Sequence, residues 1–122
     1  MITRRELLSA VGAAAAASVT PFASGAGAAE PIRIALIGCG GMGSGHLRLL
    51  APRKDVQIAC LCEPDANRLA QSLKLVEAAG QKGVQAVKDL RAALDDKSVQ
   101  AVWIATPDHW HAPAAILAAD AG

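Results

Sequence analysis

The chain has 122 residues, a length that suits one small domain, and hydrophobic residues make up 52% of it, enough for a packed core. Ten alanines among the first thirty residues inflate that share, and the remainder has the composition of an ordinary soluble α/β protein. Outside Arg4, Arg5 and Glu6 the chain carries ten basic and ten acidic residues, and this balance argues against binding to nucleic acid or to an anionic membrane.

The first thirty residues read as an export signal. Arg4 and Arg5 stand just ahead of an apolar run, residues 7–19, which is too short and too rich in alanine for a membrane span of about 20 residues. The small residues Ala26-Gly27-Ala28 suit a signal peptidase. This pattern resembles a twin-arginine signal peptide over residues 1–28, which implies export in the folded state to the periplasm or another extracytoplasmic space. An uncleaved anchor or an amphipathic helix is the alternative.

From Pro31 onward, strand and helix patterns alternate. Apolar, β-branched runs indicate strands buried on both faces, as in parallel sheets, and i, i+4, i+7 spacing indicates the helices. In chain order the segments are a strand at 32–37, a helix ending near 50, a strand at 56–62, a helix at 65–79, a strand at 83–87, a helix at 89–94, a strand at 99–105 and a helix at 112–121. This order predicts an α/β fold with a doubly wound parallel Rossmann sheet of about four strands.

A glycine cluster joins the first strand to the first helix. Gly38-Cys39-Gly40-Gly41-Met42-Gly43 matches G-x-G-x-x-G in the context that a dinucleotide site requires. We expect Gly38 to permit the tight turn, Gly40 to let a diphosphate approach the backbone, and Gly43 to let the helix pack closely. The N–H groups near Gly41 and Met42 would face the phosphates. A glycine-rich turn without a ligand is the alternative.

An acidic residue follows at the expected distance. Glu63 lies 20 residues after Gly43, at the end of the second strand, where a carboxylate accepts hydrogen bonds from both adenosine ribose hydroxyls. Because a 2′-phosphate would meet like charge there, we predict NAD in preference to NADP. Arg68 lies close enough in sequence to complicate this preference. The alternative role for Glu63 is that of a solvated carboxylate at a strand end.

The three cysteines do not form a disulfide framework. Cys60 and Cys62 are two apart in a predicted strand and therefore face the same side. We interpret them, with Cys39, as small buried hydrophobic residues, with a metal or redox pair as the less favoured alternative.

The fourth strand is followed by Thr106-Pro107-Asp108-His109-Trp110-His111, at the sheet edge where such folds bind ligands. We expect Pro107 to fix the turn and Asp108 to cap the next helix. Two histidines alone suggest a metal site, but no third ligand is evident and we predict none. A structural role, with each histidine bonded to backbone, is the other alternative.

Together these elements resemble the family of glucose-fructose oxidoreductase, inositol dehydrogenase and the rhizopine catabolism proteins. The resemblance is carried by residues 32–37, 38–43, 62–65 and 105–111, and it covers the chain from about Pro31 to its end. It implies that Thr106, Pro107 and the Asp108 backbone line the nicotinamide ribose, and that His111 approaches the nicotinamide near the substrate. It also implies an oxidoreductase that acts on a sugar or cyclitol, with homo-oligomers left open.

The resemblance also implies parts that these 122 residues do not contain. They are a Glu-Lys-Pro element whose lysine assists proton transfer, and a second domain that shapes the substrate site. We therefore expect residues 29–122 to be an incomplete NAD(P)-binding domain of a longer protein, without catalytic residues of its own, and to be poorly soluble or dimeric alone.

Three alternative functions remain open at this stage. An NAD-dependent glycoside hydrolase of the same fold would oxidise its substrate transiently and return the hydride. A non-catalytic module would bind NAD without turnover. A methyltransferase also has a glycine-rich loop, although Gly43 and the Thr-Pro-Asp element disfavour it.

Overall fold

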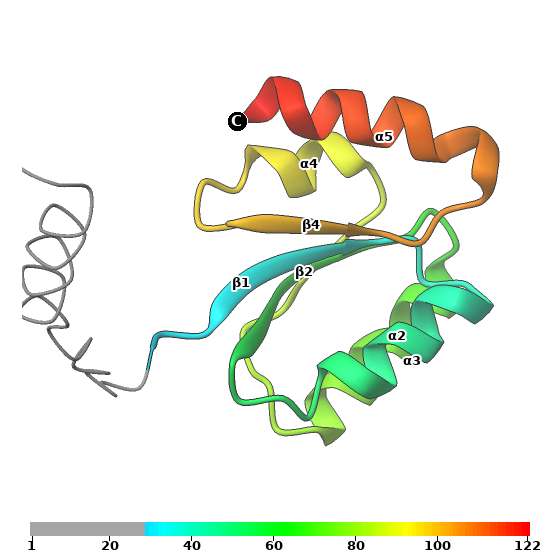
Figure 1. Cartoon of the computed structure of the whole chain (residues 1–122). Helices are drawn as coiled ribbons and strands as arrows, with labels where there is room; N and C mark the ends of the chain where they lie inside the picture. Colours follow the sequence, from blue (N-terminus) through cyan, green and yellow to red (C-terminus); the bar gives the residue numbers. More distant parts are fainter. Residues whose placement is uncertain (1–28) are drawn as a thin grey trace, which may run out of the picture.

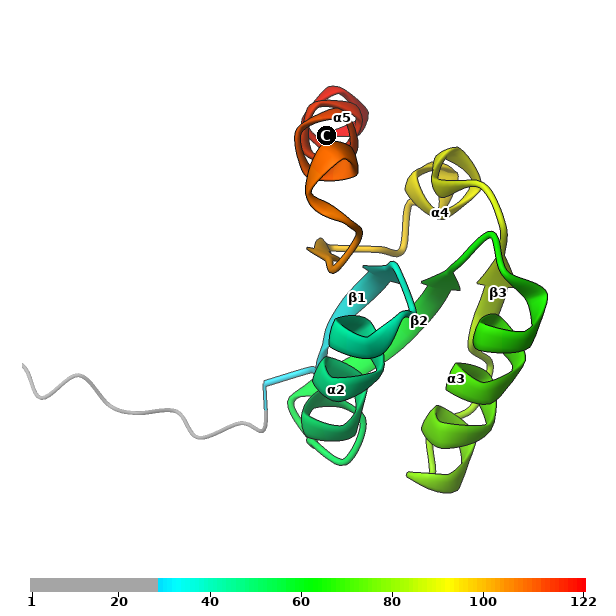
Figure 2. The same cartoon turned by 90° about the vertical axis from the view of Figure 1, so that its right-hand side faces the viewer.

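The computed structural model describes residues 29–122 and shows three layers, with helices on both faces of one sheet (Figure 1). The elements follow in the order β1 (Ile32–Ile37), α2 (Gly41–Leu50), β2 (Val56–Cys62), α3 (Ala66–Ala78), β3 (Gln85–Val87), α4 (Leu90–Asp95), β4 (Ala101–Ile104) and α5 (Asp108–Ala121). Helices α2 and α3 cover one face of the sheet, and α4 and α5 cover the other (Figure 2).

All strand pairs in the sheet are parallel, and the strand order is β3-β2-β1-β4. Each connection therefore crosses over through a helix, as parallel pairing requires. The chain runs outward from β1 through β2 to β3 and then returns to place β4 on the other side of β1. This reversal confirms the predicted α/β Rossmann fold, and it brings the carboxyl ends of β1 and β4 side by side.

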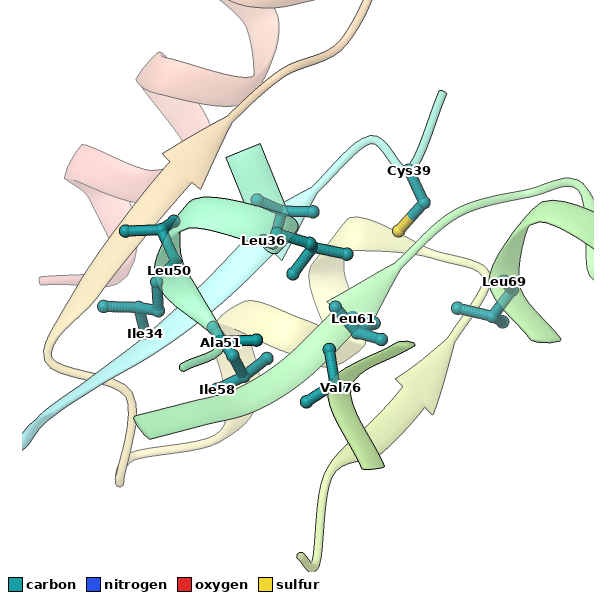
Figure 3. Packing of buried hydrophobic residues seen from close by; sticks show 10 residues of the cluster. Ile34, Leu36, Cys39, Leu50, Ala51, Ile58, Leu61, Leu69 and Val76 are labelled. Atoms are coloured by element: carbon teal, nitrogen blue, oxygen red, sulfur yellow. The ribbon is translucent and has the colours of Figure 1, made fainter. Parts of the chain in front are cut away.

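The core has two parts, one on each face of the sheet. Beneath α2 and α3, side chains from β1, β2 and the two helices pack against one another, as Ile34, Leu36, Leu50, Leu61 and Val76 do in Figure 3. On the other face Ala35, Ile37, Cys60 and Cys62 pack beneath α4 with Ala93. Both faces of β1 and β2 are thus buried, which confirms the interpretation of their apolar runs and the shared side of Cys60 and Cys62.

The predicted start of the last helix and its predicted cap were both wrong. Helix α5 begins at Asp108, four residues before the predicted start, and Asp108 is its first helical residue instead of its cap. Pro107 holds the cap position, since its ring already restricts φ to a value suited to entering a helix, and the Asp108 side chain makes no capping bond. The aromatic and imidazole side chains of residues 109–111 made this helical turn resemble a loop.

The third and fourth strands are shorter than predicted. β3 starts at Gln85 because Gly83 has a φ of +70°, which no extended strand adopts. β4 pairs with β1 only over residues 101–104. The predicted signal peptide, residues 1–28, lies outside the described residues. None of the helices that the structure describes has the length and apolar character needed to cross a bilayer.

Candidate dinucleotide site

A cavity of about 680 Å³ opens at the carboxyl ends of the strands. This volume lies within the usual range for small-molecule sites. Seven of the residues singled out in the sequence line it, namely Gly38, Gly40, Gly41, Met42, Glu63, Thr106 and Pro107. The fold therefore brings together three segments that are far apart in the chain: the glycine loop, the end of β2 and the segment after β4.

Two of the glycines are required by packing. Gly38 has a φ of +96°, and a Cβ there would lie 2.7 Å from the carbonyl carbon of Ala105. A Cβ at Gly43 would lie 1.9 Å from the Gly38 carbonyl oxygen. Since both neighbours are backbone atoms that cannot move aside, the turn out of β1 and the close seating of α2 both depend on glycine. The sequence-based roles of these two residues agree with this geometry.

Gly40 and Gly41 have no such packing reason. The nearest atom to a Cβ at Gly40 is a terminal nitrogen of Arg68 at 3.9 Å, and a Cβ at Gly41 would meet nothing within 4 Å. Gly40 is the cap residue of α2, no side chain caps the helix, and its first turn carries no acidic residue. The first N–H groups of a helix have no partner within it, so here they remain available to an anion that enters the cavity.

Glu63 is buried at the floor of this region, with only 7% of its surface exposed. Its Oε2 accepts a hydrogen bond of 2.8 Å from the backbone N–H of Cys39, and its Oε1 accepts one of 3.1 Å from the N–H of Asp65. The structure thus excludes the alternative of a freely solvated strand-end carboxylate. Two further lone pairs on the carboxylate are left for a ligand.

On the opposite side of the cavity, Thr106 and Pro107 follow β4. The Thr106 Oγ1 atom is buried and has no hydrogen-bond partner among residues 29–122. A buried hydroxyl without a partner is costly and is rare in folded proteins. Because Thr106 lines the cavity, this hydroxyl could bind a polar group of a ligand there. Together with the uncapped start of α2, it gives the cavity polar groups that fit a dinucleotide.

Three predicted site residues do not line the cavity. Gly43 is buried beneath the loop, where it supports α2, whereas Asp108 and His111 are exposed in the first turn of α5. Their neighbours His109 and Trp110 line the cavity in their place. The approach of His111 to a bound nicotinamide stays a prediction.

The lining residues that follow β3 were not predicted from the sequence. Lys88, Leu90 and Arg91 line the cavity at the end of that strand, and Arg68 lines it from α3. The order of the strands could have indicated these residues, because the carboxyl ends of all strands in a parallel sheet lie at the same edge. The third strand had only a weak apolar pattern, so the residues after it were not recognised as candidates.

The cysteine thiols are not reactive groups of this site. Burial is the main cause that raises the pKa of Cys39 and of Cys60 to about 11, and that of Cys62 to about 12. They stay protonated at neutral pH, and a protonated thiol is a poor nucleophile and a poor metal ligand. Among residues 29–122, no three His, Cys, Asp or Glu side chains gather as a metal site requires.

Comparison with known proteins assigns this domain to a described family. Residues 32–122 match the model of a family described as an oxidoreductase family with an NAD-binding Rossmann fold. The match covers all eight helices and strands described above.

Two kinds of enzyme are found among the relatives of this chain. The chain is 34% identical over 125 residues to a glycosyl hydrolase family 109 protein of Stenotrophomonas maltophilia, covering 98% of this chain and 28% of the relative. It is 32% identical over 94 residues to an inositol 2-dehydrogenase of Corynebacterium glutamicum strain R, covering 76% of this chain and 26% of the relative.

A solved structure shows the same fold. The myo-inositol 2-dehydrogenase of Lactobacillus plantarum superposes with a TM-score of 0.65 at 28% identity, over 75% of this chain and 26% of the other. The chain thus spans little more than a quarter of the length of each of these three proteins.

Proposed function

The chain belongs to the glucose-fructose oxidoreductase, inositol dehydrogenase and rhizopine catabolism (Gfo/Idh/MocA) family, and residues 32–122 form its NAD-binding Rossmann domain. From this family membership we propose the reaction that the domain serves. It holds the nicotinamide cofactor for an oxidoreductase that transfers a hydride to or from a hydroxyl-bearing carbon of a sugar or cyclitol. The inositol dehydrogenases among its relatives support this substrate class.

One observation carries the proposal: the uncapped start of α2 exposes backbone N–H groups to the cavity, next to Gly40, a glycine that neither packing nor backbone conformation requires. Gly40 has open space where a side chain would stand, and no side chain caps the helix. A diphosphate fills that space and satisfies those amides, and the helix dipole favours its charge.

Each residue of the cavity then has a task in binding and orientation. The N–H groups near Gly41 and Met42 bind the diphosphate, and Glu63 accepts hydrogen bonds from the adenosine ribose hydroxyls. Thr106 offers its unpartnered hydroxyl on the side of the cavity where the nicotinamide ribose would lie, next to Pro107. The bound nicotinamide itself supplies the hydride chemistry, and the protein orients it.

The cofactor preference is tested by comparing dissociation constants of the chain for NAD and NADP by calorimetry. We expect NAD to bind at least about tenfold more tightly, because the Glu63 carboxylate repels a 2′-phosphate. Arg68, Lys88 and Arg91 lie around the same cavity and supply the opposing charge. Equal or tighter binding of NADP would overturn the preference, and absence of binding to either cofactor would overturn the function.

The hydrolase relative supports a second candidate. The match to the glycosyl hydrolase family 109 protein extends over 98% of this chain, more than the match to the inositol dehydrogenase. The two reactions differ in their net products, and they are separated in the whole protein that carries this domain. NADH accumulating with free inositols or sugars supports the dehydrogenase, whereas release of an aglycone from aryl glycosides without net NADH supports the hydrolase. Tight NAD binding with neither product indicates a non-catalytic module.

We also propose that the protein is exported by the twin-arginine route. The arginine pair and the uncharged segment 7–29 support this proposal. A double Arg4→Lys, Arg5→Lys variant should remain in the cytoplasm in a fractionation experiment, whereas the unaltered protein should reach the periplasm. Equal export of both would refute the route.

A further inference from the structure

The Glu63 carboxylate already has partners in the protein, before any ligand is considered. Two backbone N–H groups donate to it, from Cys39 at 2.8 Å and from Asp65 at 3.1 Å. The backbone N–H of Glu63 itself donates to the Val87 carbonyl of β3 at 3.0 Å. The residue is therefore anchored to β3 and to the entry of α3, and its side chain reaches across to the glycine loop.

The bond to Cys39 constrains the backbone of a loop whose one side-chain anchor is Cys39 itself, which is 3% exposed in the core and has its thiol 3.9 Å from the Cys62 carbonyl oxygen. Cys39 stands between Gly38 and Gly40, and the N–H of Gly38 is tied to the Cys62 carbonyl at 2.8 Å. Beyond Cys39, Gly40 and Gly41 have no side chains with which to pack. Glycine has the largest conformational freedom of all residues, so the bond from Glu63 adds to the burial of Cys39 in keeping the amides of this loop in place.

We propose that Glu63 is a positioning residue for the diphosphate loop in addition to its ribose role, a proposal that rests on the proposed function. Its carboxylate holds the Cys39 N–H and thereby sets where Gly40 and the start of α2 stand. Diphosphate binding then depends on Glu63 even when the ligand has no ribose hydroxyls to offer. The residue that selects the cofactor and the loop that binds its phosphates form one unit.

Whether removal of the Glu63 carboxylate weakens or tightens diphosphate binding distinguishes the tether from simple charge repulsion. A carboxylate near a diphosphate repels it, so charge alone predicts that removing Glu63 tightens the binding of any diphosphate. Loss of the tether predicts the opposite, because the loop must then be ordered when the ligand binds. The two explanations cannot both hold for a ligand without hydroxyls.

The experiment uses the full chain and 2′,3′-dideoxyadenosine 5′-diphosphate, which lacks both hydroxyls that Glu63 would bind. We expect Glu63→Ala to weaken its binding about tenfold or more, the effect of losing one buried charge-assisted hydrogen bond. Glu63→Gln is the comparison variant: its amide oxygen can still accept from the Cys39 N–H without the charge, while its amide nitrogen cannot accept from the Asp65 N–H, and it should retain clearly more of the binding than Glu63→Ala. Unchanged or tighter binding by Glu63→Ala would overturn the proposal. Binding of NAD by the unaltered chain in the same assay reports on the proposed function separately.

Amide hydrogen exchange of the ligand-free chain gives a second readout that needs no binding. The Cys39 amide should exchange at least about tenfold faster in Glu63→Ala than in Glu63→Gln or the unaltered chain. The amide of Gly38, bonded to the Cys62 carbonyl, is the internal control for an intact fold. Equal protection of Cys39 in Glu63→Ala and the unaltered chain, with Gly38 also protected, would overturn the proposal whatever the ligand affinity.

Discussion

At the scale of single residues, the glycines of the loop meet two different requirements, close packing against backbone and open space for a ligand. Gly38 and Gly43 are demanded by neighbouring backbone, at 2.7 Å and 1.9 Å from a Cβ, whereas Gly40 has open space. Two of the three pattern glycines thus serve the fold, and the third leaves space for the proposed ligand. The pattern predicted these separate roles, and the distances to neighbouring backbone give the loop a direct test.

Gly40→Ala and Gly43→Ala should therefore have opposite consequences. Gly43→Ala should destabilise the chain by about 3 kcal/mol or more, because its Cβ overlaps the Gly38 carbonyl. Gly40→Ala should cost at most about 1 kcal/mol through the weaker cap, yet weaken NAD binding at least about tenfold by occupying the diphosphate space. Urea denaturation and calorimetry measure the two effects. A Gly40→Ala chain that binds NAD normally would argue against the site.

At the scale of elements, the helices of this domain begin in two different ways. The Asp65 side chain accepts hydrogen bonds from the backbone N–H groups of Asn67 and Arg68 at the start of α3, and Asp89 accepts one from Arg91 at the start of α4. Helices α2 and α5 have no side-chain cap, although residues of all four helices line the cavity. Helices α3 and α4 are thus capped by aspartate, and the start of α2, where the diphosphate would bind, is left uncapped.

Asp65→Ala should lower the melting temperature of the chain, and the effect should depend on pH. Hydrogen bonds from the backbone N–H of Arg68 and, less strongly, of Asn67 lower the pKa of Asp65 below its ordinary value of 3.8. A carboxyl whose pKa falls on folding stabilises the folded state above its unfolded pKa, and that stability is lost as pH falls through the folded pKa.

The difference in melting temperature between Asp65→Ala and the unaltered chain should thus be full near pH 6 and shrink below about pH 4. Asp108→Ala is the matched control, because its side chain makes no capping bond, and it should have a smaller effect near pH 6. A pH-independent difference for Asp65→Ala would contradict the capping role.

At the scale of the whole molecule, the sheet has two unequal edges. β3 is only three residues long, which limits pairing with another chain. β4 pairs with β1 alone among the described residues, and beside its free edge Trp103 is 41% exposed. The indole N–H of Trp103 donates to Nδ1 of His46 on α2 at 2.9 Å, which satisfies its polar atom but leaves much of the ring uncovered. An unpaired strand beside an exposed aromatic ring favours association.

We expect the chain to associate reversibly as its concentration rises, and Trp103→Lys to weaken this association. Lysine beside a strand edge opposes pairing, because its charge would be buried by an incoming strand. Ile116→Lys is the control, since Ile116 is an exposed hydrophobic residue of α5 and not of the strand, and it should change association less. Sedimentation velocity at several concentrations measures the outcome, and a monomer across the whole range would contradict the expectation.

The sequence by itself determined the fold class, because it depends on short-range patterns. Alternation of apolar runs with helical spacing predicted a parallel sheet of about four strands, and the glycine pattern with Glu63 predicted a dinucleotide site whose residues mostly line one cavity. Boundaries were less accurate where local signals conflicted, as at the start of α5.

Only the tertiary structure decided how distant residues meet. β2 carries one extra residue relative to β1, between the pairs Ile34–Ile58 and Ala35–Cys60, so that Ile58 shares a core with Leu61 instead of with Cys60. The contact of Glu63 with the Cys39 N–H likewise joins residues 24 positions apart. Such contacts depend on strand register and on the crossover path, which are set by packing across the whole sheet and leave no periodic trace in the chain.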